Sequence, residues 1–177
     1  MKKTIVIGVT GSIAAYKAAD LTSRLVKLNY DVTVIMTQSA KKLICEQTFF
    51  TISQNPVISD LWDVSDWKPE HIALAEKCDL FVIAPSTANF IGKFTNGIAD
   101  DALTTFALSR TCTVLIAPAM NTHMWEQPAV QNNCKILSDR GVHFVGPGSG
   151  FLACGTTGEG RLIDIPIIVD RINELLK

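Results

Sequence analysis

Two short polar segments carry side chains of the kinds that bind a phosphate group. Gly11 and Ser12 follow the apolar run 4–9, where glycine permits close approach of the backbone and serine can cap a helix, so that free N–H groups face an anion. The segment 37–39 follows the apolar run 31–36 and carries two hydroxyls and an amide. Together they predict a phosphate site, although a glycine turn with a serine cap would explain the first segment equally well.

The same segments argue against two common nucleotide sites. A dinucleotide site requires the spacing G-x-G-x-x-G and an acidic residue at the end of the second strand. The chain has Gly8 and Gly11 without that spacing, and Met36-Thr37 where the acidic residue would stand. The lysine of a P-loop is also missing from the sequence. We therefore expect a mononucleotide such as FMN rather than NAD or a nucleoside triphosphate.

Three further polar segments are candidates for ligand binding or for helix starts. Residues 84–89 stand at the end of an apolar run. They contain a proline and small polar side chains that could cap a helix or hold a cofactor. Residues 118–125 gather methionine and tryptophan around the amide of Asn121, which could bind a carboxylate, whereas Met and Trp are more often core residues. Asp100 and Asp101 are interpreted as helix-start charges, which the helix dipole favours.

The apolar runs are continuous rather than alternating, which is typical of strands covered on both faces. They alternate with helical patterns, and this rhythm predicts an α/β fold: a single doubly wound, Rossmann-like (flavodoxin-like) domain with a parallel sheet, spanning residues 1–177. Ligands of such sheets bind beyond the carboxyl ends of the strands, so we expect the polar segments to meet there. The predicted strands are 4–9, 31–36, 80–84, 113–117 and 142–145, and the predicted helices include 13–28, 72–77 and 166–176.

A glycine-rich stretch, residues 146–161, interrupts this rhythm near the end of the chain. Loops of this length are uncommon in compact domains and often act as lids over sites. We interpret the stretch as a mobile flap, with a disordered surface loop as the alternative.

Composition excludes several classes of partner and site. Sixteen basic residues are balanced by 17 acidic ones, so no positive field attracts nucleic acid. No apolar run approaches the roughly 20 residues that span a bilayer, and we expect a cytoplasmic protein with no membrane partner.

The five cysteines are widely spaced without a C-x-x-C pair, which fits neither a disulfide framework nor a metal site. Cys45, Cys78, Cys112 and Cys134 are interpreted as buried packing residues. With 47% hydrophobic residues in a short chain, oligomerisation is expected.

Three motifs of the chain are specific to one family. The segment Pro118–Trp125 fits the signature P-x-M-N-x-x-M-W, residues 152–155 with 158–161 fit a flap motif, and Glu70-His71-Ile72 fits a histidine segment. On these motifs the chain resembles the flavin-dependent cysteine decarboxylases, and the resemblance covers nearly the whole chain. Within that family, a cysteine in the flap is the mark of the branch that acts on phosphopantothenoylcysteine in coenzyme A synthesis.

The resemblance implies a role for each site residue. His71 would be the base for substrate oxidation, and Cys154 would be the acid of the closing reduction. Asn121, with Met124 beside it, would bind the substrate carboxylate. Phe90 stands where the family more usually has a small or hydroxylated residue. The residues implied to hold FMN are Gly11, Ser12, Ile13, Thr37, Gln38, Ser39, Thr87, Ala88, Asn89, Phe90 and Ala119.

The chemistry implied by the resemblance is a redox-neutral decarboxylation. Oxidation of the cysteinyl thiol to a thioaldehyde creates an electron sink, loss of CO2 gives an ene-thiolate, and a hydride and a proton then give 4'-phosphopantetheine. The resemblance also implies trimers, a small-molecule substrate and, for a chain of 177 residues, a separate ligase that makes this substrate. The alternatives are a lantibiotic-type peptidyl-cysteine decarboxylase, a flavin prenyltransferase and a non-catalytic flavoprotein, either an electron carrier or a regulatory subunit.

Overall fold

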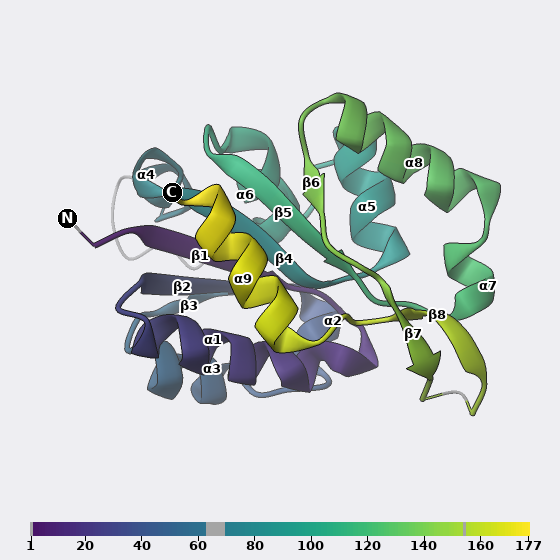
Figure 1. Ribbon diagram of the computed structural model, residues 1–177. Helices are drawn as coiled ribbons and strands as arrows, with labels where there is room; N and C mark the ends of the chain where they lie inside the picture. Colours follow the sequence, from purple (N-terminus) through teal and green to yellow (C-terminus); the bar gives the residue numbers. More distant parts are fainter. Residues whose placement is uncertain (1, 63–69, 154) are drawn as a thin grey trace.

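The computed structural model describes residues 2–62, 70–153 and 155–177, without the side chains of residues 70–73. Its centre is a six-stranded sheet in which every pairing is parallel (Figure 1). The predicted doubly wound parallel sheet is therefore confirmed. The strands are β1 Thr4–Val9, β2 Asp31–Met36, β3 Val57–Ile58, β4 Leu80–Ser86, β5 Thr113–Pro118 and β6 His143–Phe144.

The strand order, β3-β2-β1-β4-β5-β6, places a switch point between β1 and β4. From β1 the chain moves outward through β2 to β3, and from β4 it moves the other way through β5 to β6. This is the order of the Rossmann fold, in which the segments leaving the two central strands diverge and open a crevice at the carboxyl edge. The polar segments of the sequence follow the strands at this edge.

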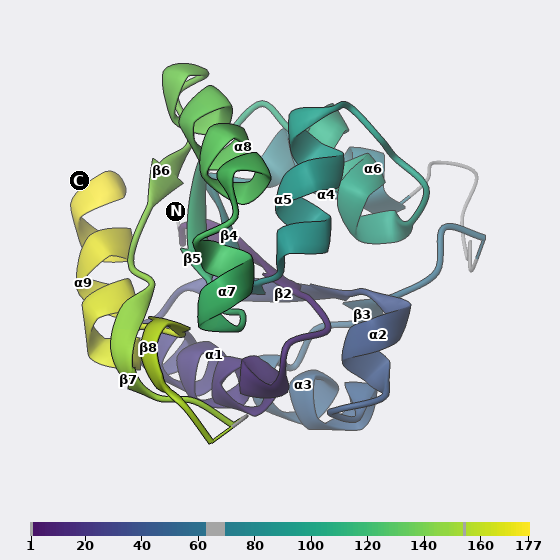
Figure 2. The same cartoon turned by 90° about the vertical axis from the view of Figure 1, so that its right-hand side faces the viewer.

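Helices cover both faces of the sheet, with α1, α3 and α9 on one side and α4, α5, α6 and α8 on the other (Figures 1 and 2). Strand β1 shows how the two layers arise, because successive side chains of a strand point to opposite faces. Ile5 and Ile7 pack in the first layer, Val6 packs in the second, and all three are fully buried. The helices are α1 Lys17–Lys27, α2 Gln38–Lys41, α3 Glu46–Ser53, α4 Glu70–Lys77, α5 Ala88–Thr95, α6 Ala102–Ser109, α7 Thr122–Trp125, α8 Pro128–Asp139 and α9 Ile165–Leu175.

Two helix boundaries differ from the sequence-based expectation in ways that concern the site. The first predicted helix, 13–28, begins with a 3₁₀ turn at Ile13–Tyr16 before α1. The predicted helix 72–77 begins two residues earlier, at Glu70, so that His71 lies in the first turn of α4 instead of before the helix.

The glycine-rich stretch forms an antiparallel hairpin of β7 (Gly148–Phe151) and β8 (Thr157–Arg161) rather than an irregular loop. The hairpin lies beside α7 (Figures 1 and 2), and the backbone N–H of Met120 donates to the carbonyl of Gly160 at 2.9 Å. Gly160 has a φ of +125°, and a Cβ there would strike the Met120 carbonyl, so only glycine permits this close approach. The predicted flap is thus tied to the end of β5.

The cysteines that the structure describes do not all behave as predicted. Cys78 is buried, and Cys112 and Cys134 are half-buried, but Cys45 is exposed, and the prediction that it packs in the core is wrong. Cys45 precedes the first turn of α3, outside the buried face of that helix. Within the described part of the chain, no helix is long and apolar enough to cross a membrane.

Candidate active site

Two adjoining cavities open at the carboxyl ends of the strands, at the switch point. The larger has a volume of about 510 Å³, the smaller about 280 Å³, and both are lined by Gly11, Thr87 and Met124. Cavities of this size are typical of small-molecule and cofactor sites. The larger is also lined by Ser12, Ile13, Ala14, Tyr16, Lys17, Ala119, Met120, Asn121, Phe151, Leu152, Ala153, Gly160, Arg161 and Leu162, and the smaller by Thr10, Thr37, Ser39, Asn89, Phe90, Asp101 and Thr104.

The loops that form the cavity walls are tied to one another by hydrogen bonds. The hydroxyl of Thr10 donates to the carbonyl of Pro85 at 2.8 Å, and the backbone N–H of Thr87 donates to that hydroxyl at 3.0 Å. Thr10 is buried, so these bonds join the ends of β1 and β4 across the switch point away from water. The N–H of Ala119 donates to the carbonyl of Ser86 at 2.9 Å and joins β4 to β5 in the same way.

Four polar side chains at the cavity walls are also helix N-caps. Ser12, Thr37 and Thr87 use a hydroxyl, and Asn121 uses Oδ1, which accepts from the N–H of His123 at 2.9 Å. Because each cap fixes the start of a helix at the wall, the amide N–H groups of these first turns lie next to the cavity. Such an edge favours an anionic group over a cationic one.

Gly11 lies against the second loop. A Cβ on Gly11 would overlap the Cβ of Ser39, so the two loops could not approach as they do with any larger residue. The N–H of Thr37 donates to the carbonyl of Val9 at 3.1 Å and holds the second loop beside the first. Glycine at position 11 therefore permits the close packing of these two loops.

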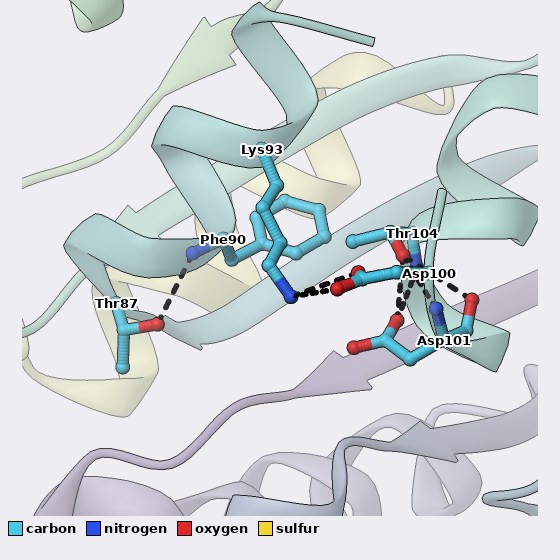
Figure 3. A network of polar contacts seen from close by, with 6 residues as sticks. All are labelled: Thr87, Phe90, Lys93, Asp100, Asp101 and Thr104. Atoms are coloured by element: carbon cyan, nitrogen blue, oxygen red, sulfur yellow. Dashed lines mark hydrogen bonds and ion pairs between the residues drawn. The ribbon is translucent and has the colours of Figure 1, made fainter. Parts of the chain in front are cut away.

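The smaller cavity is completed by residues that sequence reasoning did not place in the site. Asp101 and Thr104 form a capping box at the start of α6, with the Thr104 N–H and hydroxyl both 2.7 Å from Asp101 Oδ1 (Figure 3). The spacing D-x-x-T is a recognisable cap signal, but nothing in it indicates a cavity wall. The helix-start interpretation is right for Asp101.

Asp100 has a different role from the one predicted, because it lies one residue before the cap of α6. Its carboxylate pairs with Lys93 of α5, with Nζ–O distances of 2.8 and 2.7 Å (Figure 3). This hydrogen bond with Lys93 holds the pKa of Asp100 below its usual range. The pair links α5 and α6 beside the smaller cavity and leaves Asp100 outside the cavity lining.

Two basic residues were also missed, Lys17 and Arg161, which line the larger cavity. Arg161 pairs with Asp164 at 2.9 Å, and its Nε is buried without a hydrogen-bond partner. Lys17 lies in the first turn of α1, where the helix dipole opposes a positive charge. The two side chains make the larger cavity suitable for an anionic ligand.

Most of the residues predicted for the site line the two cavities. They are Gly11, Ser12, Ile13, Thr37, Ser39, Thr87, Asn89, Phe90, Ala119, Asn121 and Met124. Gln38 and Ala88 line neither cavity, and the Gln38 amide instead donates to the carbonyl of Ser59 at 3.0 Å. Phe90 is almost fully buried and packs against Phe94, so it serves the core as well as the cavity wall.

The two predicted catalytic residues are not located by the structure. Cys154 lies outside the described residues, although its neighbour Ala153 lines the larger cavity. The side chain of His71 is also outside them. Its helix, α4, lies near the amino ends of the strands, at the end of the molecule opposite α7 (Figure 1), and no described residue of α4 lines either cavity.

The fold and the cavities define an α/β protein with a mononucleotide-type site at the switch point. The chain matches the Flavoprotein family over residues 1–177 and belongs to that family. Among curated proteins it is 44% identical over 179 residues to a Streptococcus mutans protein named "Probable phosphopantothenoylcysteine decarboxylase", covering 99% of this chain and 100% of that protein. It is 46% identical over 163 residues to the coenzyme A biosynthesis bifunctional protein CoaBC of Bacillus subtilis, covering 90% of this chain but only 40% of that protein.

Solved structures of cysteine decarboxylases also resemble this chain. A PPC decarboxylase cysteine-to-serine mutant complexed with pantothenoylaminoethenethiol superposes with a TM-score of 0.88 at 26% identity, and 98% of each chain is covered. The FMN-dependent cysteine decarboxylase SpaF has a TM-score of 0.83 at 29% identity, covering 99% of this chain and 98% of that one. Both likenesses extend over nearly the whole length of this chain.

Proposed function

We propose that this chain catalyses the FMN-dependent decarboxylation of 4'-phosphopantothenoylcysteine to 4'-phosphopantetheine in coenzyme A biosynthesis. The observation that carries the proposal is the larger cavity, which is lined by Asn121 and Met124 together with residues of the β7–β8 hairpin. The Streptococcus mutans relative, which the chain matches over its full length, supports the same substrate.

The residues at the cavities fit FMN. A mononucleotide needs N–H donors and hydroxyls for its phosphate and a close backbone approach, and Ser12, Thr37 and Ser39 surround Gly11 in this way. The second strand ends at Met36, followed by the cap Thr37, without the acidic residue that would hold the ribose of a dinucleotide.

The substrate carboxylate is assigned to Asn121. Its Oδ1 accepts at the start of α7, so the amide NH2 is the group that is chemically suited to donate to a carboxylate. Lys17 and Arg161 add positive charge to the cavity that takes this substrate, which carries both a phosphate and a carboxylate. When bound, FMN supplies reversible two-electron chemistry, which creates the electron sink that a simple amidocarboxylate lacks.

Two proton-transfer roles complete the proposal. Cys154, whose neighbours Leu152 and Ala153 line the larger cavity, delivers a proton to the substrate carbon skeleton at the end of the reaction. His71 accepts a proton during thiol oxidation, since a neutral imidazole is a suitable base near neutral pH.

The position of α4 supports an oligomer. Because α4 lies far from the cavities of its own chain, we assign His71 to the site of a neighbouring subunit. The rim of the larger cavity also exposes apolar side chains: Ile13 and Tyr16 are each 62% exposed and Phe151 is 72% exposed. Clusters of this kind mark contact surfaces. A homotrimer is the assembly we propose.

Three further points from the sequence stay predictions: a location in the cytoplasm, a single domain over residues 1–177, and a separate ligase that supplies the substrate. Such a ligase would join cysteine to a phosphorylated carboxylic acid, which is the reaction that gives the proposed substrate.

A peptidyl-cysteine decarboxylase of the lantibiotic type is the second candidate, because SpaF, an FMN-dependent cysteine decarboxylase, has a similar fold over nearly the whole of both chains. One experiment separates the two. The purified protein, supplied with FMN, is incubated in parallel with 4'-phosphopantothenoylcysteine and with a peptide that ends in cysteine, and the products are analysed by mass. We expect loss of CO2 from the small substrate alone. Turnover of the peptide alone would show that a peptide is the substrate instead of 4'-phosphopantothenoylcysteine. Turnover of neither would contradict the decarboxylase function.

A further inference from the structure

Two cysteines lie together at the end of the sheet away from the cavities. The Sγ atoms of Cys78 and Cys112 are 2.9 Å apart. Cys78 lies two residues before the start of β4 and Cys112 immediately precedes β5, and these strands are paired in parallel with Leu80 opposite Thr113. The pairing of these strands therefore brings the two cysteines close together at the amino ends of β4 and β5, one register position apart.

The two thiols differ in surroundings. Cys78 is buried and its backbone N–H donates to Leu74 at 3.0 Å, at the end of α4, whereas Cys112 is half-buried on a turn. A small disulfide would therefore reach Cys112 before Cys78. Cys78 would be protected until Cys112 has reacted.

Charged groups near the pair favour the thiolate of Cys112. The hydrogen bond between the two thiols and, after it, the nearby Arg110 guanidinium lower the pKa of Cys112, whereas the partial burial of this thiol opposes them. The Nη1 group of Arg110 donates to the Cys112 carbonyl at 3.2 Å, and its Nε is buried without a hydrogen-bond partner, so its charge is held close to the sulfurs. Asp79 opposes this effect, but its own carboxylate is engaged by Lys3 at 2.8 Å and by the N–H of Thr4 at 2.8 Å.

We propose that Cys78 and Cys112 form a reversible redox pair that reacts with a low-molecular-weight disulfide such as oxidised glutathione. The Cys112 thiolate attacks one sulfur of the small disulfide, forming a mixed disulfide and releasing one small thiol. Cys78 then loses its proton, attacks the Cys112 sulfur and releases the second small thiol. In total the two protein thiols lose two electrons and two protons, and the small disulfide gains them.

The bond would join the amino ends of the two strands whose carboxyl ends carry the site. It would close a covalent loop between positions 34 apart in the sequence, containing β4, α5 and α6. Strand β4 has seven residues and so separates the pair from the site by about 20 Å. The oxidised protein is therefore expected to unfold at a higher temperature than the reduced protein.

Peptide mapping of the FMN-loaded wild-type protein tests this directly. After incubation with oxidised glutathione, acid quenching and alkylation, we expect a Cys78–Cys112 disulfide, a mass lower by two hydrogen atoms, and a higher thermal midpoint that dithiothreitol reverses. A disulfide that joins other cysteines, or unchanged thiols at both positions, would overturn the proposal, as would an oxidised protein with an unchanged midpoint.

Single variants test the order of the two steps. Cys78→Ala should trap one glutathione on Cys112, whereas Cys112→Ser should leave Cys78 unmodified. Cys134→Ser is the matched control, because burial raises the pKa of Cys134 to about 11 and this thiol should remain reduced throughout. Glutathione on Cys78 of the Cys112→Ser protein at the wild-type rate would overturn the assignment of Cys112 as the attacking thiol. The wild-type mapping decides the existence of the pair even if a variant folds poorly.

Discussion

At the scale of single residues, Asn121 combines a structural and a proposed binding role, and one substitution separates them. Aspartate caps a helix as well as asparagine, so Asn121→Asp should preserve the start of α7 and the FMN content. The new charge would face the substrate carboxylate in a shielded cavity, and the loss of a hydrogen bond adds to this repulsion. We expect a cost of about 3 kcal/mol, or roughly a hundredfold lower kcat/KM.

The measurement is steady-state turnover at matched flavin absorbance. His123→Gln serves as control, because the His123 side chain is 87% exposed and its backbone N–H, which the cap uses, is unchanged. Turnover of Asn121→Asp at the wild-type rate would remove Asn121 from the site.

Cys154 carries the second prediction at this scale. If its thiol supplies the final proton, Cys154→Ser should still release CO2 but stop before 4'-phosphopantetheine, because a hydroxyl is a far weaker acid than a thiol with a pKa of about 8.5. A single-turnover reaction without oxygen should give a product two hydrogens lighter than 4'-phosphopantetheine, with the flavin absorbance still bleached. Formation of 4'-phosphopantetheine at the normal rate would assign the proton to another group.

At the scale of elements, the contact between the first two loops carries the third prediction. Gly11→Ala places a methyl group against Ser39, and overpacking of this kind costs about 1–3 kcal/mol. We expect weaker FMN binding and a lower unfolding temperature. Gly92→Ala is the matched control, because the nearest atom to a Cβ at this helical position is 3.7 Å away. Equal flavin affinity in the two variants, measured by fluorescence titration, would contradict the loop contact.

The strands of the fold could be predicted because buried parallel strands are apolar throughout, and β2 spans the predicted residues 31–36. Strand β3 was missed because only Val57 and Ile58 form it. The hairpin was missed because β7 and β8 are rich in glycine and carry no hydrophobic alternation. The strand order could not be predicted either, since pairing between distant strands leaves no local pattern in the sequence.

The site, too, could be predicted where it depends on local sequence and could not where it depends on packing between distant segments. Loops that directly follow strands, such as the one with Thr87, could be placed at the carboxyl edge from the order of elements alone. Asp101 and Thr104 could not, because they reach the smaller cavity only through the packing of α6 against α5 and the Lys93–Asp100 pair. Lys17 and Arg161 could not be placed in the site from the sequence, because α1 and the hairpin come together around one cavity only in the folded chain.

At the scale of the whole molecule, the distance between α4 and the cavities predicts a site shared between subunits. Chains with His71→Ala and chains with Asn121→Asp should each have strongly reduced activity alone. Coexpression should restore part of the activity, because mixed oligomers contain sites with an intact His71 from one chain and an intact Asn121 from the other. Differently tagged chains purified in sequence verify the mixing. Mixed oligomers that stay inactive would place His71 in the site of its own chain.

The central claim, a redox-neutral decarboxylation at the switch-point cavity, is tested most directly by stoichiometry. The FMN-loaded protein is given 4'-phosphopantothenoylcysteine labelled with ¹³C in the cysteinyl carboxylate, while labelled CO2, 4'-phosphopantetheine and dissolved oxygen are followed together. Equal amounts of labelled CO2 and 4'-phosphopantetheine, with no oxygen consumed, are the predicted result. No release of label, or release that consumes oxygen in proportion and leaves an oxidised product, would contradict it.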